Sequence, residues 1–147
     1  MNPVWWTKLD DMTFKKKQQV RLLVIDDSDR YLKSIRECVE MCPPDYDLTI
    51  EFADSESKTR ELMKSWDPSV VLLDAHLPAV NALQMLERYL AELVPVIITS
   101  DTRSSEIGLS ARTKGAVGYI SKSENPDEIE TLLERIGTVS IDFGMQH

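Results

Sequence analysis

The chain has 147 residues, of which 42% are hydrophobic and 29% are charged, and its net charge is −8. This length predicts one domain with its own buried core, and the composition is typical of globular proteins. No apolar run approaches the roughly 18 residues of a membrane-spanning helix, and the N-terminus lacks the apolar stretch of a secretory signal. We therefore expect a cytoplasmic protein without a membrane partner.

The charge is unevenly distributed along the chain. Residues 1–21 carry five basic and two acidic residues, a net charge of +3, so the remainder has a net charge of −11. A body this acidic lacks the basic face of nucleic-acid-binding proteins, which excludes a nucleic-acid partner. The basic segment also contains Trp5 and Trp6, and we expect these side chains to pack on the body or on a second copy in a homodimer.

Strand and helix patterns alternate five times in chain order, beginning at residue 20. Apolar runs or apolar–polar alternation predict strands at 20–25, 48–52, 70–74, 94–99 and 117–121. Helical spacing and capping residues predict helices at about 29–42, 55–66, 83–93, 105–114 and 125–136. This alternation predicts a parallel sheet with helices on both faces. We expect an N-terminal extension (1–19), one domain (20–137) and a C-terminal tail (138–147).

The strand at 70–74 is the most informative element. Four large aliphatic residues in a row predict a strand buried on both faces, and the run stops at Asp74. Ligands in open α/β sheets bind beyond the carboxyl ends of the strands, where Asp74 lies. Taken alone, this acid equally fits a cap for the following turn.

The other strand ends carry similar chemistry: Asp26 and Asp27 after the first strand, Thr99 on the fourth and Lys122 after the fifth. Carboxylates that converge at one edge repel one another unless a cation lies among them, and hard oxygen ligands suit Mg²⁺ or Mn²⁺. A lysine and a hydroxyl beside them suit an anion. The set predicts phosphoryl transfer to a carboxylate nucleophile.

Four motifs in this order carry a family resemblance: V-I-D-D-S (24–28), L-L-D-A-H-L-P (72–78), P-V-I-I-T-S (95–100) and K-G-A-V-G-Y-I-S-K (114–122). With their spacing, they make residues 20–137 similar to the receiver domain of two-component response regulators, the CheY-like family. The resemblance implies a flavodoxin-like, doubly wound (βα)5 fold with a five-stranded parallel sheet in the order 2-1-3-4-5.

The resemblance also implies roles for the metal-binding and phosphorylated residues. Asp74 would accept a phosphoryl group from the phosphohistidine of a histidine kinase or a histidine phosphotransfer protein. Asp26, Asp27, Asp74 and the backbone carbonyl of His76 would hold Mg²⁺, with Mn²⁺ as a substitute. Catalysis would be limited to self-phosphorylation and autodephosphorylation, with no external substrate.

Further roles implied by the resemblance concern signalling. Thr99 and Lys122 would bind the phosphoryl oxygens, and Thr99 and Tyr119 would form the switch. His76 and Asp101 would tune hydrolysis, and we expect them to pair and to gate the approach of water together. An output protein would bind the face formed by the helix at 105–114, the strand at 117–121 and the last helix.

Two positions depart from the family pattern. Asn81-Ala82 stand where the family usually has Asp-Gly, so a positive φ at Ala82 would be strained. Ser123 follows Lys122 where the family has a cis proline, so we expect a trans bond and a displaced Lys122.

The leading hypothesis is a stand-alone receiver, because the ten residues after 137 hold no effector domain. The alternative is a pseudo-receiver that acts as a phosphorylation-independent interaction or dimerisation module. A third class, the aspartyl-phosphate phosphatases, matches the D-x-D spacing of Asp27 and Asp29 but leaves Asp74 without a role. A flavin carrier is excluded because an acidic first loop repels the flavin phosphate.

Overall fold

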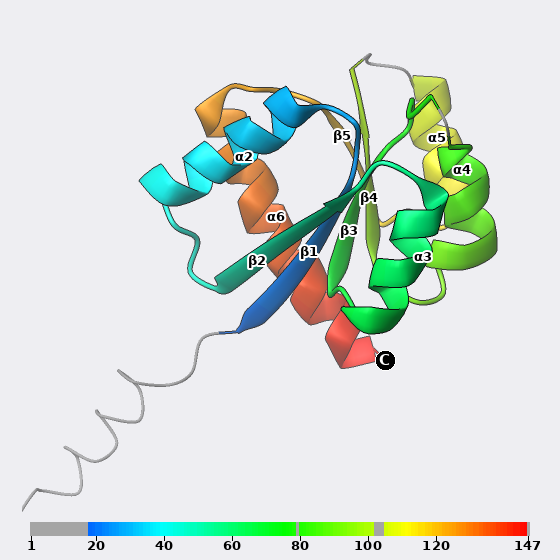
Figure 1. Cartoon of the computed structure of the whole chain (residues 1–147), viewed down its shortest axis with the longest axis horizontal. Helices are drawn as coiled ribbons and strands as arrows, with labels where there is room; N and C mark the ends of the chain where they lie inside the picture. Colours follow the sequence, from blue (N-terminus) through cyan, green and yellow to red (C-terminus); the bar gives the residue numbers. More distant parts are fainter. Residues whose placement is uncertain (1–17, 79, 102–104, 147) are drawn as a thin grey trace, which may run out of the picture.

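The computed structural model describes residues 18–78, 80–101 and 105–146, and within them a five-stranded parallel sheet has the order β2-β1-β3-β4-β5. The strands are β1 (Gln19–Ile25), β2 (Asp47–Ala53), β3 (Val70–Asp74), β4 (Val96–Ser100) and β5 (Gly118–Ser121). The helices are α2 (Asp29–Met41), α3 (Glu56–Ser65), α4 (Ala82–Met85), continued by the π-helical η1 (Leu86–Leu90), α5 (Ser105–Thr113) and α6 (Pro126–Gln146) (Figure 1). The predicted flavodoxin-like fold and strand order are confirmed.

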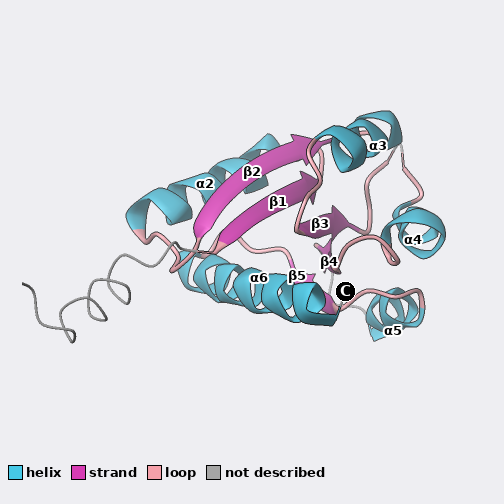
Figure 2. Cartoon of the chain, turned by 90° about the horizontal axis from the view of Figure 1, so that it is seen from below, coloured by secondary structure: helices cyan, strands magenta, loops and turns pink. Residues whose placement is uncertain are grey.

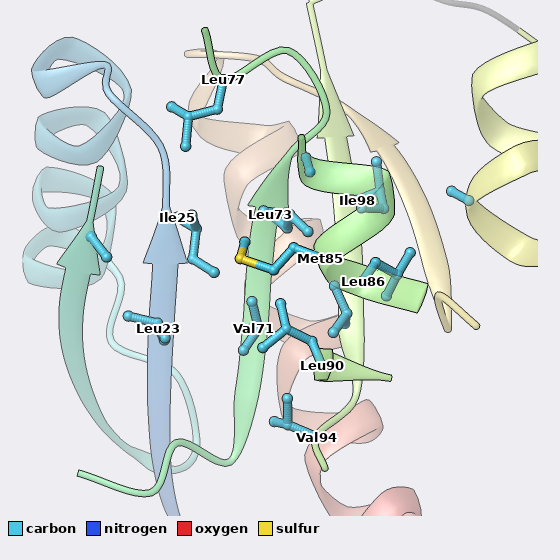
Figure 3. Packing of buried hydrophobic residues seen from close by; sticks show 14 of the residues in the cluster. Leu23, Ile25, Val71, Leu73, Leu77, Met85, Leu86, Leu90, Val94 and Ile98 are labelled. Carbon is cyan, nitrogen blue, oxygen red and sulfur yellow. The ribbon is translucent and has the colours of Figure 1, made fainter. Parts of the chain in front are cut away.

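Helices cover both faces of the sheet, as Figure 2 shows. Successive side chains of a strand point to opposite faces. In β1, Leu23 and Ile25 belong to the cluster on the face covered by α3, α4, η1 and α5, part of which Figure 3 shows, whereas Leu22 and Val24 belong to the cluster on the face covered by α2 and α6. β3 and β4 are buried along their whole length, which explains the aliphatic residues that dominate both strands.

Serine and asparagine caps begin three helices. Ser28 accepts a hydrogen bond from the N–H of Tyr31 at the start of α2, and Ser55 caps α3 in the same manner. Asn81 caps α4, so Ala82 is the first helical residue. Among the described residues other than glycine, only Asp67 has a positive φ. Ala82 therefore does not need the positive φ that would have strained it, because a capped helix starts there.

The last helix is longer than predicted. We expected it to end near residue 136, but α6 continues to Gln146. Val139 packs against the cluster between α2, α6 and the sheet, which supports the extra turns. Gly137 lies inside this helix because Tyr46 packs on it: an added Cβ would lie 2.6 Å from Tyr46 Cε1.

Residues 1–17, including Trp5 and Trp6, lie outside the described residues, so the packing expected for these two side chains stays a prediction. Within the described part of the chain, no helix combines the length and the apolar character needed to cross a membrane.

Tyr46 provides a test of this packing. Its hydroxyl donates to the carbonyl of Leu133 in α6, and burial raises the pKa of Tyr46 from 10.0 to about 12. Tyr46→Phe should lower the free energy of unfolding by about 1 kcal/mol at neutral pH, the usual net value of one hydrogen bond. Because the folded pKa lies above the unfolded one, this stabilisation is complete below pH 10 and is lost as pH rises towards about 12.

The measurement is urea unfolding of parent and variant from neutral to alkaline pH. The advantage of the parent should shrink across that interval. Tyr89→Phe, on the opposite face of the sheet, controls for the loss of a hydroxyl. A difference between the parent and Tyr46→Phe that does not change with pH would contradict the assignment.

Candidate functional site

The register of the strands gathers the acidic residues at the carboxyl edge of the sheet. Ile25 pairs with Leu73, so Asp26 lies beside Asp74, and Asp74 pairs directly with Thr99 on β4. Carboxylate oxygens of Asp26, Asp27 and Asp74 all lie within 4.8 Å of one another. The edge of the sheet thus holds three carboxylates in a group, as the strand ends predicted.

Lys122 reaches into this group from the end of β5. Its ammonium lies 2.9 Å from Asp26 Oδ2 and 3.5 Å from Asp74 Oδ2. The side chains of Lys122, Asp26 and Asp74 are only 9%, 3% and 5% exposed, so their charges interact with little screening by solvent. The peptide after Lys122 is trans, as expected, yet the side chain still enters the site. The expected displacement of Lys122 was therefore wrong.

The ionisation of this pair reflects burial and charge. Burial raises the pKa of Asp26, although the Lys122 ammonium and the N–H of Ser28 both oppose that shift. For Lys122, burial alone would lower the pKa, but the hydrogen bond and the negative charge of Asp26 outweigh it, so the pKa of Lys122 is raised. Lys122 therefore stays a cation at neutral pH.

The donor set fits a hard divalent cation. Three carboxylates lie close together, and the one ammonium of Lys122 contacts two of them, Asp26 and Asp74, which leaves the group negatively charged. Asp26 Oδ2 is buried and, although it lies close to Lys122 Nζ, it has no well-directed hydrogen bond from any described residue. Asp27 is exposed, so water has access to the group. Oxygen ligands with room for water are what Mg²⁺ requires.

Asp27, Asp74 and Lys122 line a cleft of about 440 Å³ between the loops after β1, β3 and β5. Asp74 Oδ1 accepts a hydrogen bond from the N–H of His76, which orients the carboxylate. A carboxylate held in this manner beside a lysine and a cation site can attack a phosphorus atom. The geometry therefore supports phosphoryl transfer to Asp74.

The two switch candidates lie on neighbouring strands. Thr99 is buried, and its hydroxyl donates a long 3.5 Å hydrogen bond to the carbonyl of Leu73. Tyr119 is half-buried and packs against Gly108 of α5, where an added Cβ would lie 3.2 Å from the ring. Glycine is a poor helix former, but the missing side chain of Gly108 makes room for the Tyr119 ring.

His76 and Asp101 flank the cleft but do not pair with each other. The His76 Nε2 atom lies 2.8 Å from the Ser100 hydroxyl, whereas Asp101 Oδ1 lies 4.0 Å from Lys122 Nζ. The pairing expected between them is thus not present between these two described side chains. Each side chain has another partner within reach: Ser100 on β4 for His76, and Lys122, directly after β5, for Asp101.

The sequence patterns missed two residues of the site. Tyr31 falls within the helix predicted at about 29–42 and was not among the expected site residues, but its ring lies 5.0 Å from the Lys122 ammonium and lines the cleft. Ser100 was not singled out, although it directly follows Thr99. An aromatic residue in the first turn after an acidic pair was the available signal for Tyr31. The hydrogen bond between Ser100 and His76 had no such signal.

The cation site can be tested by metal addition and removal. Mg²⁺ at about ten times its dissociation constant should raise the free energy of unfolding by about 1.4 kcal/mol, because it binds only the folded chain. Thermal melts and amide NMR shifts, with and without a chelator, measure this effect. Asp27→Asn should abolish both responses, whereas the control Asp29→Asn, two residues away in α2, should retain them. Unchanged Mg²⁺ shifts in Asp27→Asn would overturn the assignment.

Comparisons with known proteins agree with this geometry. Residues 22–134 match the family model described as the response regulator receiver domain. The chain is 26% identical over 117 residues to the nitrate/nitrite response regulator NarL of Escherichia coli, covering 77% of this chain and 52% of NarL. It is 32% identical over 109 residues to protein-glutamate methylesterase/protein-glutamine glutaminase 3 of Burkholderia lata, covering 71% and 29% respectively.

The fold also matches solved structures. The Mn(2+)-bound form of response regulator Rcp1 superimposes with a TM-score of 0.60 at 18% identity, covering 80% of this chain and 91% of that one. The chain spans about half or less of the length of the curated relatives described above. Since the family match covers most of the chain, the protein belongs to the response regulator receiver domain family.

Proposed function

We propose that this receiver is phosphorylated on Asp74 by the phosphohistidine of a histidine kinase or a histidine phosphotransfer protein. The observation that carries the proposal is the contact of the Lys122 ammonium with Asp74, at the end of β3, and with Asp26, directly after β1, where Asp27 completes a group of three carboxylates. A carboxylate oxygen of Asp74 attacks the phosphorus atom, so a P–O bond forms as the P–N bond breaks. The bonding electrons leave with the donor imidazole, which then takes up a proton.

The chain's own residues prepare this step. The N–H of His76 holds one oxygen of Asp74, and the Lys122 ammonium faces the other. Lys122 is also placed to neutralise a phosphoryl oxygen, which supports a role in stabilising the transferred group. Thr99, which pairs with Asp74 across the sheet, would contribute its hydroxyl after turning away from Leu73.

A divalent cation belongs to this proposal. Asp26, Asp27 and Asp74 would hold Mg²⁺, or Mn²⁺ in its place, together with the backbone carbonyl of His76. When bound, the cation supplies positive charge that offsets the phosphoryl oxygens. The buried Asp26 Oδ2 and the manganese in the related Rcp1 structure support this part of the proposal.

We further propose that the signal leaves through the face of α5, β5 and α6. Phosphorylation replaces the single negative charge of the Asp74 carboxylate with the roughly 1.5 to 2 negative charges of a phosphoryl group, which would draw Thr99 inward and let Tyr119 follow. Tyr119 borders a groove of about 630 Å³ between Gly108, Arg112 and Arg135. An output protein would bind there when the ring moves. That the receiver works without an attached output domain stays a prediction, and so does its cytoplasmic location.

Phosphorylation is tested by intact-mass analysis. Incubation with acetyl phosphate and Mg²⁺ should add one phosphoryl group, because Asp74 is the oriented carboxylate. Asp74→Asn should show no addition, and Asp54→Asn, an exposed acid after β2, is the matched control that should still be modified. An unmodified parent would instead favour the pseudo-receiver, an interaction module that works without phosphorylation.

The lifetime of the phosphoryl group depends on the residues that flank the cleft. His76→Ala should accelerate loss of phosphate, because it removes an exposed ring beside Asp74 and opens the path for water. Asp101→Ala should slow it, because the carboxylate is placed to accept a hydrogen bond from the attacking water. Since the two side chains have different partners, their effects should add on a logarithmic scale.

Time courses of phosphate release from the parent, both single variants and the double variant measure this additivity. Ser100→Ala, which frees the His76 ring without removing it, separates the position of the ring from its presence. A strongly non-additive double variant would mean that His76 and Asp101 act as one gate.

A further inference from the structure

A second hollow lies at the opposite edge of the sheet from Asp74. It is a groove of about 640 Å³ between α6 and the loop that joins α2 to β2, and we call it the α6 groove. Gln18, which directly precedes β1, and Tyr46, which directly precedes β2, both line it. Because the strands are parallel, residues that precede them lie far from the carboxyl ends that form the phosphorylation site.

The lining of the α6 groove combines apolar and acidic side chains. Pro43, Leu133 and Ile141 contribute apolar surface, and Ile141 is 47% exposed. Glu130 and Glu134 stand on the same stretch of α6 and are both exposed. Asp45 adds a third acid from the opposite wall. Apolar surface bordered by acids fits a segment that carries aromatic rings and lysines.

The chain itself supplies such a segment. Residues 1–17 contain Trp5, Trp6 and Phe14 together with four lysines and two aspartates, a net charge of +2 on a chain whose net charge is −8. Lys15, Lys16 and Lys17 immediately precede Gln18, so the segment joins the body at the border of the groove.

The short connection favours this segment over any separate partner. Eleven residues lie between Trp6 and Gln18, and an extended chain spans about 3.3–3.6 Å per residue, so the connection is long enough for the rings to reach the groove. A tether of this length holds the segment at an effective concentration of the order of millimolar, which a free ligand rarely reaches.

We propose that residues 1–17 dock in the α6 groove of their own chain, with Trp5 and Trp6 on its apolar surface and the lysines beside Asp45, Glu130 and Glu134. Docking would cover Ile141 and pair the acids on α6. It gives a reason for two tryptophans in a basic segment. The groove lies away from Asp74, so this inference does not rest on the proposed phosphorylation.

Tryptophan fluorescence of the full-length chain tests the proposal. Trp66→Phe leaves Trp5 and Trp6 as the two remaining tryptophans, so acrylamide quenching then reports on them alone. Combining Glu130→Lys and Glu134→Lys should raise the quenching constant by about twofold or more, since each exposed ion pair lost shifts such an equilibrium by roughly 1.5- to 5-fold. Glu92→Lys with Glu128→Lys, two exposed acids outside the groove, is the matched control and should change nothing.

A second variant tests the apolar part of the groove. Ile141→Asp should also raise the quenching constant, and circular dichroism checks that each variant remains folded. Equal quenching in the parent, the groove variants and the control would overturn the proposal. Quenching that falls as protein concentration rises would overturn docking within one chain, because it would place the segment on a second copy.

Discussion

The contact between Lys122 and the carboxylates of Asp26 and Asp74 is the interaction on which the rest of the site depends. The backbone register of β1, β3 and β4 forces these acids together, and their burial leaves little water to separate their charges. One ammonium balances part of the negative charge and leaves the remainder for a cation. An unpaired charge in this position would be strongly destabilising, so the lysine contributes to the stability of the folded site.

The sheet provides a rigid frame for that contact, but its rigidity is uneven. β3 and β4 are buried at every residue, whereas β5 is only half-buried and α5 contributes one fully buried side chain, Ala111. Elements with few buried apolar contacts open and shift most easily. Lys122 and Tyr119 both lie on this less buried side, so a change of charge at Asp74 would act where the fold has few buried apolar contacts.

The two edges of the sheet differ in chemistry for a topological reason. In a parallel sheet every strand delivers its carboxyl end to one edge, and the helices return the chain to the other. Asp26, Asp74 and Lys122 therefore meet at the carboxyl edge. The opposite edge collects the ends of α2 and α6 and the point where residues 1–17 join the body, which leaves the α6 groove between them.

Local patterns in the sequence determined the order of the elements, the parallel sheet and the identity of the acids and the lysine at its carboxyl edge. Aliphatic runs that end in Asp26 and Asp74 carry most of this information, because a strand buried on both faces has a characteristic composition. What tertiary structure decided was which polar groups meet. The hydrogen bond of His76 to Ser100, the ring of Tyr31 beside Lys122 and the continuation of α6 past Gly137 all depend on contacts between distant segments, and no local pattern encodes them.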